Sequence, residues 1–349
     1  MTSRERMLCA IRGEQPDRVP VSPWGLGRVS PDSDVGRELI ATCDVWLGGG
    51  GGGFSFTGTQ LKAETITEDS VTTTVVHTPA GDLRARRQAT DITSATIEFL
   101  CKDAADVEKL LSVPYEPVAT DFSAFHAAKA KYGDAALVNM GCADAVCWPA
   151  TVLSPEDFCL LWADAPDVMA EMCRVAAERL DAYIEAACQA GVDCFRIIGG
   201  EYVTVQLGPA AVHALLTPFD ARQIDIMHHH GAVAHYHNHG PMMRFLDDLA
   251  ALGIDSLDPL EAPPWGDTDL AEARRILAGR TCIVGNLDDM EIVERLPEAE
   301  VCAIAAERLE QVGSVGFMLG GTSSGTYTER GARNFIAMVR VAEAYAQRS

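Results

Sequence analysis

From about residue 130 onward, apolar segments of strand length alternate with amphipathic segments of helical length. This alternation constrains the fold more than any other feature, because strands joined through helices form parallel sheets with right-handed crossovers. The candidate strands cover residues 136–141, 194–199, 232–239, 256–260, 282–287 and 315–319. The candidate helices cover residues 165–190, 209–230, 241–252, 268–279, 297–312 and 330–346. The sequence therefore predicts an α/β protein built on a parallel sheet.

Two parallel architectures suit such a chain, a doubly wound open sheet and a (β/α)8 barrel. No Gly-x-Gly-x-x-Gly segment follows an early strand, and polar residues follow several different strands at their carboxyl ends. Both observations favour the barrel, whose site is assembled from the loops after many strands. The 349 residues could form one large barrel or two ordinary domains. We predict a single TIM-type barrel domain over residues 1–349.

The N-terminal third departs from this alternation. Residues 3–12 are typical of a short helix, and residues 17–21 of the entry to a first strand. Six consecutive glycines, residues 48–53, require a flexible or tightly packed loop. From about residue 60 to residue 100, threonine and valine alternate with polar residues around a turn at 78–82. This pattern predicts antiparallel hairpins inserted into the barrel domain.

Charge and cysteine usage narrow the possible partners and the compartment. The formal net charge of −22 argues against nucleic acid and anionic membranes, because lysine and arginine supply most of the affinity for phosphate. The eleven cysteines are scattered, form no Cys-x-x-Cys pair and predict reduced, buried thiols. No apolar run reaches the roughly 18 to 20 residues of a membrane span, and residues 1–8 do not resemble a signal peptide. We expect a cytoplasmic protein that acts on a small molecule.

The histidines are concentrated in one candidate strand. Six of the nine lie between residues 228 and 239, and His235, His237 and His239 occupy alternate positions before Gly240. If this segment is a strand, its period of two places the three imidazoles on one face. A core histidine bonded to a neighbouring strand is the alternative for His235. His237 and His239, next to the end of the strand, are the candidates for a ligand or catalytic role.

Other polar side chains follow the neighbouring strands, and in a barrel these strand ends converge on one mouth. The candidate catalytic residues are Glu201, Asp258, Glu261 and Arg196. The candidate substrate-binding residues are Tyr202, Trp24, Asn286 and Ser324. Structural roles are the alternatives: Glu201 could accept backbone N–H groups, and Asp258 and Glu261 could cap a proline-rich turn. Arg196 lies inside a strand, where a buried arginine pairs with a protein carboxylate or binds one on a substrate.

Several motifs resemble those of one family. Arg6-Met7-Leu8, followed by Gly13-Glu14-Gln15-Pro16-Asp17-Arg18-Val19-Pro20, is similar to the N-terminal signature of the uroporphyrinogen decarboxylase superfamily, which includes the corrinoid-linked methyltransferases. The later motifs of the family are matched in order by residues 231–233, 237–240, 253–255, 258–261, 285–288 and 334–335. The resemblance covers nearly the whole chain and implies a TIM-type barrel with its site at the C-terminal mouth.

The methyltransferase branch of this superfamily has the sequence His-x-Cys-Gly where this chain has His237-Asn238-His239-Gly240. In that branch the His and Cys bind zinc with a further Cys from the last strand, and zinc converts a thiol acceptor into a thiolate. Here a histidine replaces the first cysteine, and the last strand offers Thr322, Ser323 and Ser324 with no cysteine. The resemblance therefore implies zinc held by His237, His239 and Glu201. It also implies a homodimer and methyl transfer between a small methylated substrate or thiol and a corrinoid.

Two other functions remain open on the sequence. One is a metal-independent decarboxylase or lyase, in which the histidines, Glu201 and Asp258 transfer protons on a small carboxylate held by Arg196. Porphyrinogen decarboxylation fits poorly within this class, because residues 22–28 hold one arginine where the family has an arginine-rich segment for a polyanion. The other is a non-catalytic corrinoid- or metabolite-binding protein. The chain has no Asp-x-His-x-x-Gly corrinoid motif, so a corrinoid would arrive on a partner protein.

Overall fold

The computed structural model describes residues 1–322 and 325–348. Eight parallel strands form one sheet in the order β1-β12-β11-β10-β9-β8-β7-β2. Their bounds are β1 (Val21–Ser22), β2 (Val45–Gly48), β7 (Ala136–Ala143), β8 (Cys194–Ile198), β9 (Val233–Asn238), β10 (Ser256–Pro259), β11 (Cys282–Leu287) and β12 (Phe317–Gly321). A parallel bridge between Trp24 and Trp46 joins the two ends of this order, and Trp46 N donates to Pro23 O at 3.1 Å. The sheet thereby closes on itself, and the predicted TIM-type barrel is confirmed.

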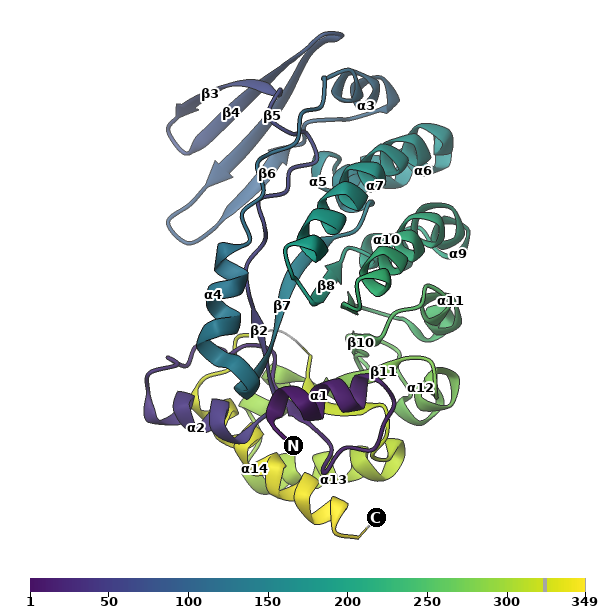
Figure 1. Ribbon diagram of the computed structural model, residues 1–349. Coiled ribbons are helices and arrows are strands. Elements are labelled where there is room, and N and C mark those ends of the chain that lie inside the picture. Colours follow the sequence, from purple (N-terminus) through teal and green to yellow (C-terminus); the bar gives the residue numbers. More distant parts are fainter. Residues whose placement is uncertain (323–324, 349) are drawn as a thin grey trace.

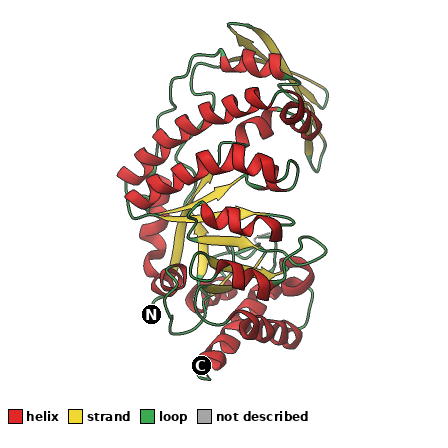
Figure 2. Ribbon diagram, turned by 90° about the vertical axis from the view of Figure 1, so that its right-hand side faces the viewer, coloured by secondary structure: helices red, strands yellow, loops and turns green. Residues whose placement is uncertain are grey.

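Helices connect the barrel strands and cover the outer face of the sheet (Figures 1 and 2). The longer ones are α2 (Asp34–Thr42), α4 (Ser123–Tyr132), α6 (Pro155–Asp164), α7 (Pro166–Gln189), α10 (Thr217–His229), α12 (Leu270–Leu277), α13 (Glu298–Val312) and α14 (Glu329–Ala346). The shorter ones are α5 (Cys147–Val152), α8 (Glu201–Thr204), α9 (Pro209–Ala211) and α11 (Leu246–Ala251). The helix predicted over 209–230 is divided into α9, a π-helical turn over Val212–Leu216 and α10. A proline lies in the first turn of both α9 and α10, where it suits a helix start.

The N-terminal helix α1 (Ser3–Ile11) closes the end of the barrel opposite its C-terminal mouth. Met7 and Ile11 pack there against lumen residues such as Leu137 and Met318. Leu137 is the second residue of β7 and Met318 the second residue of β12, so both lie near the N-terminal ends of their strands. These side chains form a hydrophobic cluster of their own, separate from the main core between strands and helices. Functional groups can therefore reach solvent only at the other end of the lumen.

A buried ionic cluster fastens α1 to the first two strands. Asp44 is fully buried and accepts hydrogen bonds from Arg6 Nη1 at 2.7 Å and from Arg18 Nη1 at 2.6 Å. Arg6 also pairs with Asp17 at 2.6 Å, and its guanidinium holds the pKa of Asp17 well below the ordinary value. The N-terminal family motif therefore stabilises the closed end of the barrel and lies away from the mouth.

The segment between β2 and β7 carries the inserted sheet that the sequence predicts. Its strands pair antiparallel in chain order. They are β3 (Lys62–Glu68), β4 (Val71–Thr78), β5 (Gly81–Ala89) and β6 (Ser94–Glu98). Figure 1 shows this sheet projecting from the barrel beside α3 (Ala104–Leu111). In its strands only Val76 and Leu83 are fully buried, so the sheet is fastened to the barrel domain by a small apolar contact.

The glycine run connects β2 with this insert and is tightly packed at two positions. A Cβ atom on Gly49 would lie 2.7 Å from Cδ2 of Phe125, and one on Gly52 would lie 2.1 Å from Cε1 of Phe122. Gly52 N also donates to the Tyr183 hydroxyl at 2.7 Å. The run therefore passes through a space that excludes side chains. Within the described residues, no helix combines the length and apolarity needed to cross a bilayer.

Candidate active site at the barrel mouth

Strand β9 brings His235 and His237 into the lumen, opposite β10. The parallel register pairs His235 with Ser256 and His237 with Asp258. His235 is fully buried, with Nδ1 2.8 Å from Ser256 Oγ and Nε2 2.8 Å from Asp258 Oδ1. Both of its ring nitrogens are thus bound to residues of β10. His235 is therefore a core histidine bonded to a neighbouring strand, the alternative that the sequence offered for it.

Asp258 connects the two lumen histidines, because its Oδ1 also lies 2.9 Å from His237 Nδ1. Burial alone would raise the pKa of this carboxyl group, but the His237 and His235 imidazoles hold the pKa of Asp258 well below its ordinary value. Burial lowers the pKa of His235 despite the opposing effect of Asp258. A neutral His235 therefore donates from Nε2 to ionised Asp258 and accepts from the Ser256 hydroxyl at Nδ1.

His239, just beyond β9, forms a second histidine–carboxylate pair at the mouth. Its Nδ1 lies 2.9 Å from Glu261 Oε1, and Gly240 N donates to Glu261 Oε2 at 2.8 Å. The hydrogen bond that His239 donates to the Glu261 carboxylate raises the pKa of His239. The rings of His237 and His239 lie nearly perpendicular, at 88°, with centroids 4.4 Å apart. The predicted pair of mouth histidines is thus brought together, and each of the two imidazoles has a carboxylate partner.

The donor set at the mouth suits zinc in its chemistry. Each imidazole is fixed by a carboxylate on Nδ1, so that Nε2 is the nitrogen left for a ligand role, as in metal sites where an outer carboxylate orients a histidine. Glu201 begins α8, and its buried Oε2 has no hydrogen-bond partner among the described residues. Over residues 1–322 and 325–348, no three His, Cys, Asp or Glu side chains form a ready-made metal cluster. His237 and His239 would therefore supply two ligands, and a third would come from Glu201 or from a bound molecule.

Aromatic rings line the lumen beneath the mouth. Trp24 stacks on Trp46 and on His235, with centroids 5.4 Å apart in both cases. The Arg196 guanidinium carbon lies 4.0 Å from the centre of the Trp24 ring, and Arg196 Nε is buried without a hydrogen-bond partner among residues 1–322 and 325–348. Burial lowers the pKa of this guanidinium. In the described part of the chain no carboxylate forms an ion pair with Arg196, although Asp258 and Glu201 are near enough to raise its pKa against the effect of burial.

Asn286 and Tyr202, two of the predicted substrate-binding residues, lie in different parts of the molecule. Asn286 is buried in the lumen strand β11, where Nδ2 donates to Leu260 O at 3.0 Å and Oδ1 has no partner in the part of the chain that the structure describes. Its free oxygen can accept a hydrogen bond from a substrate. Tyr202 packs against the main core between strands and helices, and burial raises its pKa. Ser324 lies outside the described residues.

Sequence analysis missed a second polar cluster behind the histidine strand. Tyr236 lies between His235 and His237 in β9, so its side chain is on the opposite face of the strand from theirs. Its hydroxyl donates a hydrogen bond to Oδ2 of Asp220, on α10, at 2.7 Å. Burial raises the pKa of Asp220 to about 7. Asp144, at the end of β7, is also fully buried, and burial together with Asp220 raises its pKa. Sequence analysis also missed Ser256. The signal that could have found it is its position two residues before Asp258, which places both side chains on the same face of β10.

Comparison with known proteins places the chain in a family. Residues 90–345 match the family model described as uroporphyrinogen decarboxylase (URO-D). The chain belongs to the uroporphyrinogen decarboxylase family. Among solved structures, a methyltransferase from Methanosarcina mazei has the same fold, with a TM-score of 0.64, 15% sequence identity and coverage of 99% of both chains. The family and its barrel thus agree with the resemblance found in the sequence motifs.

Other structural likenesses are more distant. A B12-independent methionine synthase from Shewanella sp. W3-18-1 has a TM-score of 0.44 at 11% identity, covering 85% of this chain and 76% of that one. An octameric ribulose-1,5-bisphosphate carboxylase/oxygenase from Pyrococcus horikoshii OT3 has a TM-score of 0.40 at 10% identity, covering 97% and 60%. No curated protein matches the sequence. Membership of the family leaves the substrate open, since the loops at the mouth determine it.

Proposed function

We propose that this chain is a methyltransferase of the uroporphyrinogen decarboxylase family in which His237 and His239 hold a divalent metal ion, zinc by preference. The two carboxylate–histidine contacts carry the proposal, Asp258 to His237 and Glu261 to His239, each at 2.9 Å. Such contacts fix the tautomer and orientation of metal-binding histidines. The methyltransferase from Methanosarcina mazei, which has the same fold, supports the reaction class.

Zinc, when bound, supplies the Lewis acidity that lowers the pKa of a thiol and favours the thiolate nucleophile. Asp258 and Glu261 hold the imidazoles in place and increase the basicity of their free nitrogens. Trp24 forms an apolar floor that limits the access of water from below. Arg196 and Asn286, with unpartnered polar atoms in the lumen, bind and orient an anionic or N–H-bearing part of the substrate.

Elemental analysis of protein purified without chelator and supplied with zinc tests the metal proposal. We expect about one zinc ion per chain, as for a single catalytic site. His237→Ala and His239→Ala should each lose most of it. The matched control is His213→Ala, because His213 is an exposed histidine whose side chain is 61% accessible. Wild-type protein that binds no zinc, or variants of His237 and His239 that retain it, would disprove the proposal.

The methyl donor is proposed to be a corrinoid on a partner protein, and free methylcobalamin is a suitable probe. In the expected step the cobalt–carbon bond breaks heterolytically, the methyl group forms a bond to the thiolate sulfur of 2-mercaptoethanol, and both electrons of the broken bond stay on cobalt as cob(I)alamin. The absorbance of the corrinoid reports this change. We expect His239→Ala to slow the reaction by roughly 100-fold or more. Equal rates with and without the protein would exclude this donor.

Arg196, whose Nε has no hydrogen-bond partner among the described residues, favours a second candidate function, a metal-independent decarboxylase or lyase acting on a small carboxylate. Here the guanidinium would bind the carboxylate, and His237 with Asp258 would transfer a proton. The two functions differ in their response to chelation. Turnover of a small carboxylate with a bell-shaped pH profile that is unchanged by EDTA supports this second function, and loss of activity in EDTA supports the first.

A further inference from the structure

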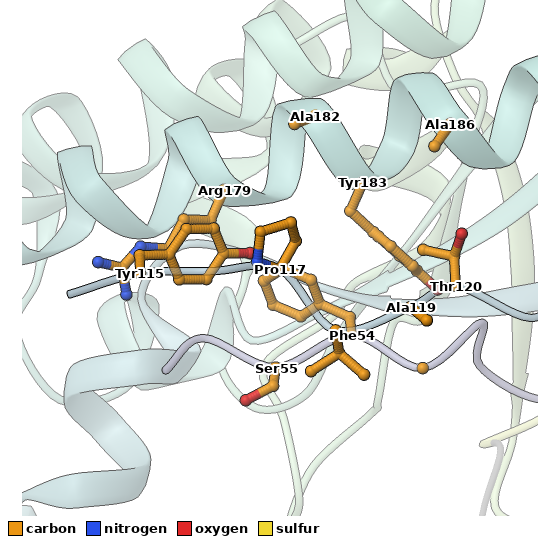
Figure 3. A pocket seen from close by; sticks show the side chains of 12 residues that line it. Phe54, Ser55, Tyr115, Pro117, Ala119, Thr120, Arg179, Ala182, Tyr183 and Ala186 are labelled. Atoms are coloured by element: carbon orange, nitrogen blue, oxygen red, sulfur yellow. The ribbon is translucent and has the colours of Figure 1, made fainter. Parts of the chain in front are cut away.

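A cavity of about 460 Å³ lies beside α7, and Figure 3 shows the side chains that line it. One wall is a single face of α7. The other wall consists of residues 53–55, Tyr115 and residues 117–120, which belong to the two segments that connect the barrel with the inserted sheet. The cavity shares no residue with the mouth site. The α7 residues that line it are spaced by three or four positions, as expected for one helical face, and are Arg179, Ala182, Tyr183 and Ala186.

The cavity has the shape and lining of a site for a flat ring. Figure 3 shows the rings of Tyr115, Phe54 and Tyr183 in a row beneath α7, with Ala182 and Ala186 on the helix above them. The small alanine side chains leave the space open. Tyr183 is held in place because its hydroxyl accepts from Gly52 N at 2.7 Å, and its ring centroid lies 5.1 Å from that of Phe54. The aromatic wall is therefore preformed.

Arg179 places a positive charge at this wall. Its guanidinium carbon lies 4.2 Å from the centre of the Tyr115 ring and 4.7 Å from the centre of the Trp148 ring, and it donates to the backbone oxygen of Phe56. Within the described residues it has no ion pair with a carboxylate. Arg179 is partly buried, and this burial lowers its pKa.

The missing counter-ion points to an anionic ligand. The chain has 50 acidic and 28 basic residues, so carboxylates are abundant, yet in the described structure none forms an ion pair with Arg179, and Glu178 acts on it only through space. A partly buried charge without a partner costs free energy that an anion would recover. The surrounding rings supply apolar contact area for an attached aromatic group.

We propose that this cavity binds a small aromatic carboxylate, with its ring between α7 and the side chains of Phe54 and Tyr115 and its carboxylate on Arg179. The volume lies within the range of small-molecule sites, about 300 to 1,000 Å³. The inference is independent of the function proposed for the mouth, because none of the mouth residues lines the cavity.

Calorimetric titration with 3-phenylpropionate and with the neutral 3-phenylpropanol tests the proposal. We expect saturable binding of the acid and about tenfold weaker binding of the alcohol, since only the acid forms charge-assisted hydrogen bonds with Arg179. Absence of saturable binding of the acid, or equal affinities for the two probes, would overturn the proposal.

Variants locate the bound probe. Ala182→Leu places a larger side chain in the cavity from an exposed helical position and should abolish binding without lowering the unfolding temperature. Arg179→Gln should reduce the affinity for the acid to that for the alcohol, and Arg179→Lys should restore part of the difference. Arg196→Met serves as the control for binding at the mouth and should have no effect. Binding that survives Ala182→Leu, or that is lost in Arg196→Met, would place the probe elsewhere and refute the inference.

Discussion

Nδ1 of His237 lies 2.9 Å from Oδ1 of Asp258, and the same oxygen lies 2.8 Å from Nε2 of His235. One fully buried carboxylate therefore orients two imidazoles at successive levels of the lumen. The upper ring belongs to the mouth, and the lower ring is stacked against Trp24. Asp258 thus couples the reactive end of the site to its aromatic floor.

Asp258→Asn should weaken zinc binding by roughly 10- to 100-fold, because an amide cannot hold the His237 imidazole with the same charge-assisted bond. Competition with a coloured zinc chelator measures this affinity. The matched control is Asp247→Asn, since Asp247 is 77% exposed and pairs only with Arg280 at the surface. Unchanged affinity in Asp258→Asn would show that this carboxylate does not orient a ligand.

Asp44→Ala should destabilise the fold by about 3 to 5 kcal/mol, because it leaves Arg6 and Arg18 buried without their shared partner. Urea denaturation measures the free energy of unfolding. Asp17→Ala is the comparison, since Asp17 is 41% exposed and its loss should cost about 1 kcal/mol or less. Equal effects of the two substitutions would contradict the central role of Asp44.

Gly52→Ala should destabilise the protein by about 1 to 3 kcal/mol, because its Cβ would lie 2.1 Å from Phe122 and 2.8 Å from the Tyr183 hydroxyl. The neighbouring Gly51→Ala is the control, as a Cβ atom there meets nothing within 4 Å and should change stability by less than about 0.5 kcal/mol. Thermal unfolding of both variants distinguishes a tightly packed glycine run from a loose one. Similar unfolding temperatures would favour the loose run.

Asp220→Asn should make the protein more stable at neutral pH. The folded protein retains the Asp220 proton up to a pKa of about 7, whereas the unfolded chain releases it near the ordinary value of 3.8. The free energy of unfolding contributed by this group therefore falls as pH rises between these values and is constant above them. The asparagine side chain of the variant is neutral at every pH and can still accept the hydrogen bond from the Tyr236 hydroxyl. The free energy of unfolding of the variant therefore does not fall in this way as pH rises.

Denaturant titrations at several pH values test this prediction. The stability advantage of Asp220→Asn should grow from pH 4 to pH 7 and then level off. Asp225→Asn, an exposed acid on the same helix, should show no such trend. An advantage that is independent of pH would mean that Asp220 is ionised throughout.

Much of the fold follows from local pattern. The strands β8, β9 and β11 and the antiparallel insert agree with the prediction within one or two residues, because their apolar and polar alternation reflects burial directly. The strand β2 was missed, as its four residues pass straight into the glycine run. The division of the 209–230 helix was also missed, since nothing in its apolar pattern distinguishes a π-helical turn from an α-helical one.

The sequence by itself determined the barrel class, the single face of His235 and His237, and the family, because these depend on periodicity and on motif order. Tertiary structure decided the partners: Asp258 and Glu261 each bind a histidine 21 or 22 positions earlier. Only the parallel register of β9 and β10 brings those side chains within hydrogen-bond distance. The same holds for Arg196, whose stacking on Trp24 depends on closure of the barrel.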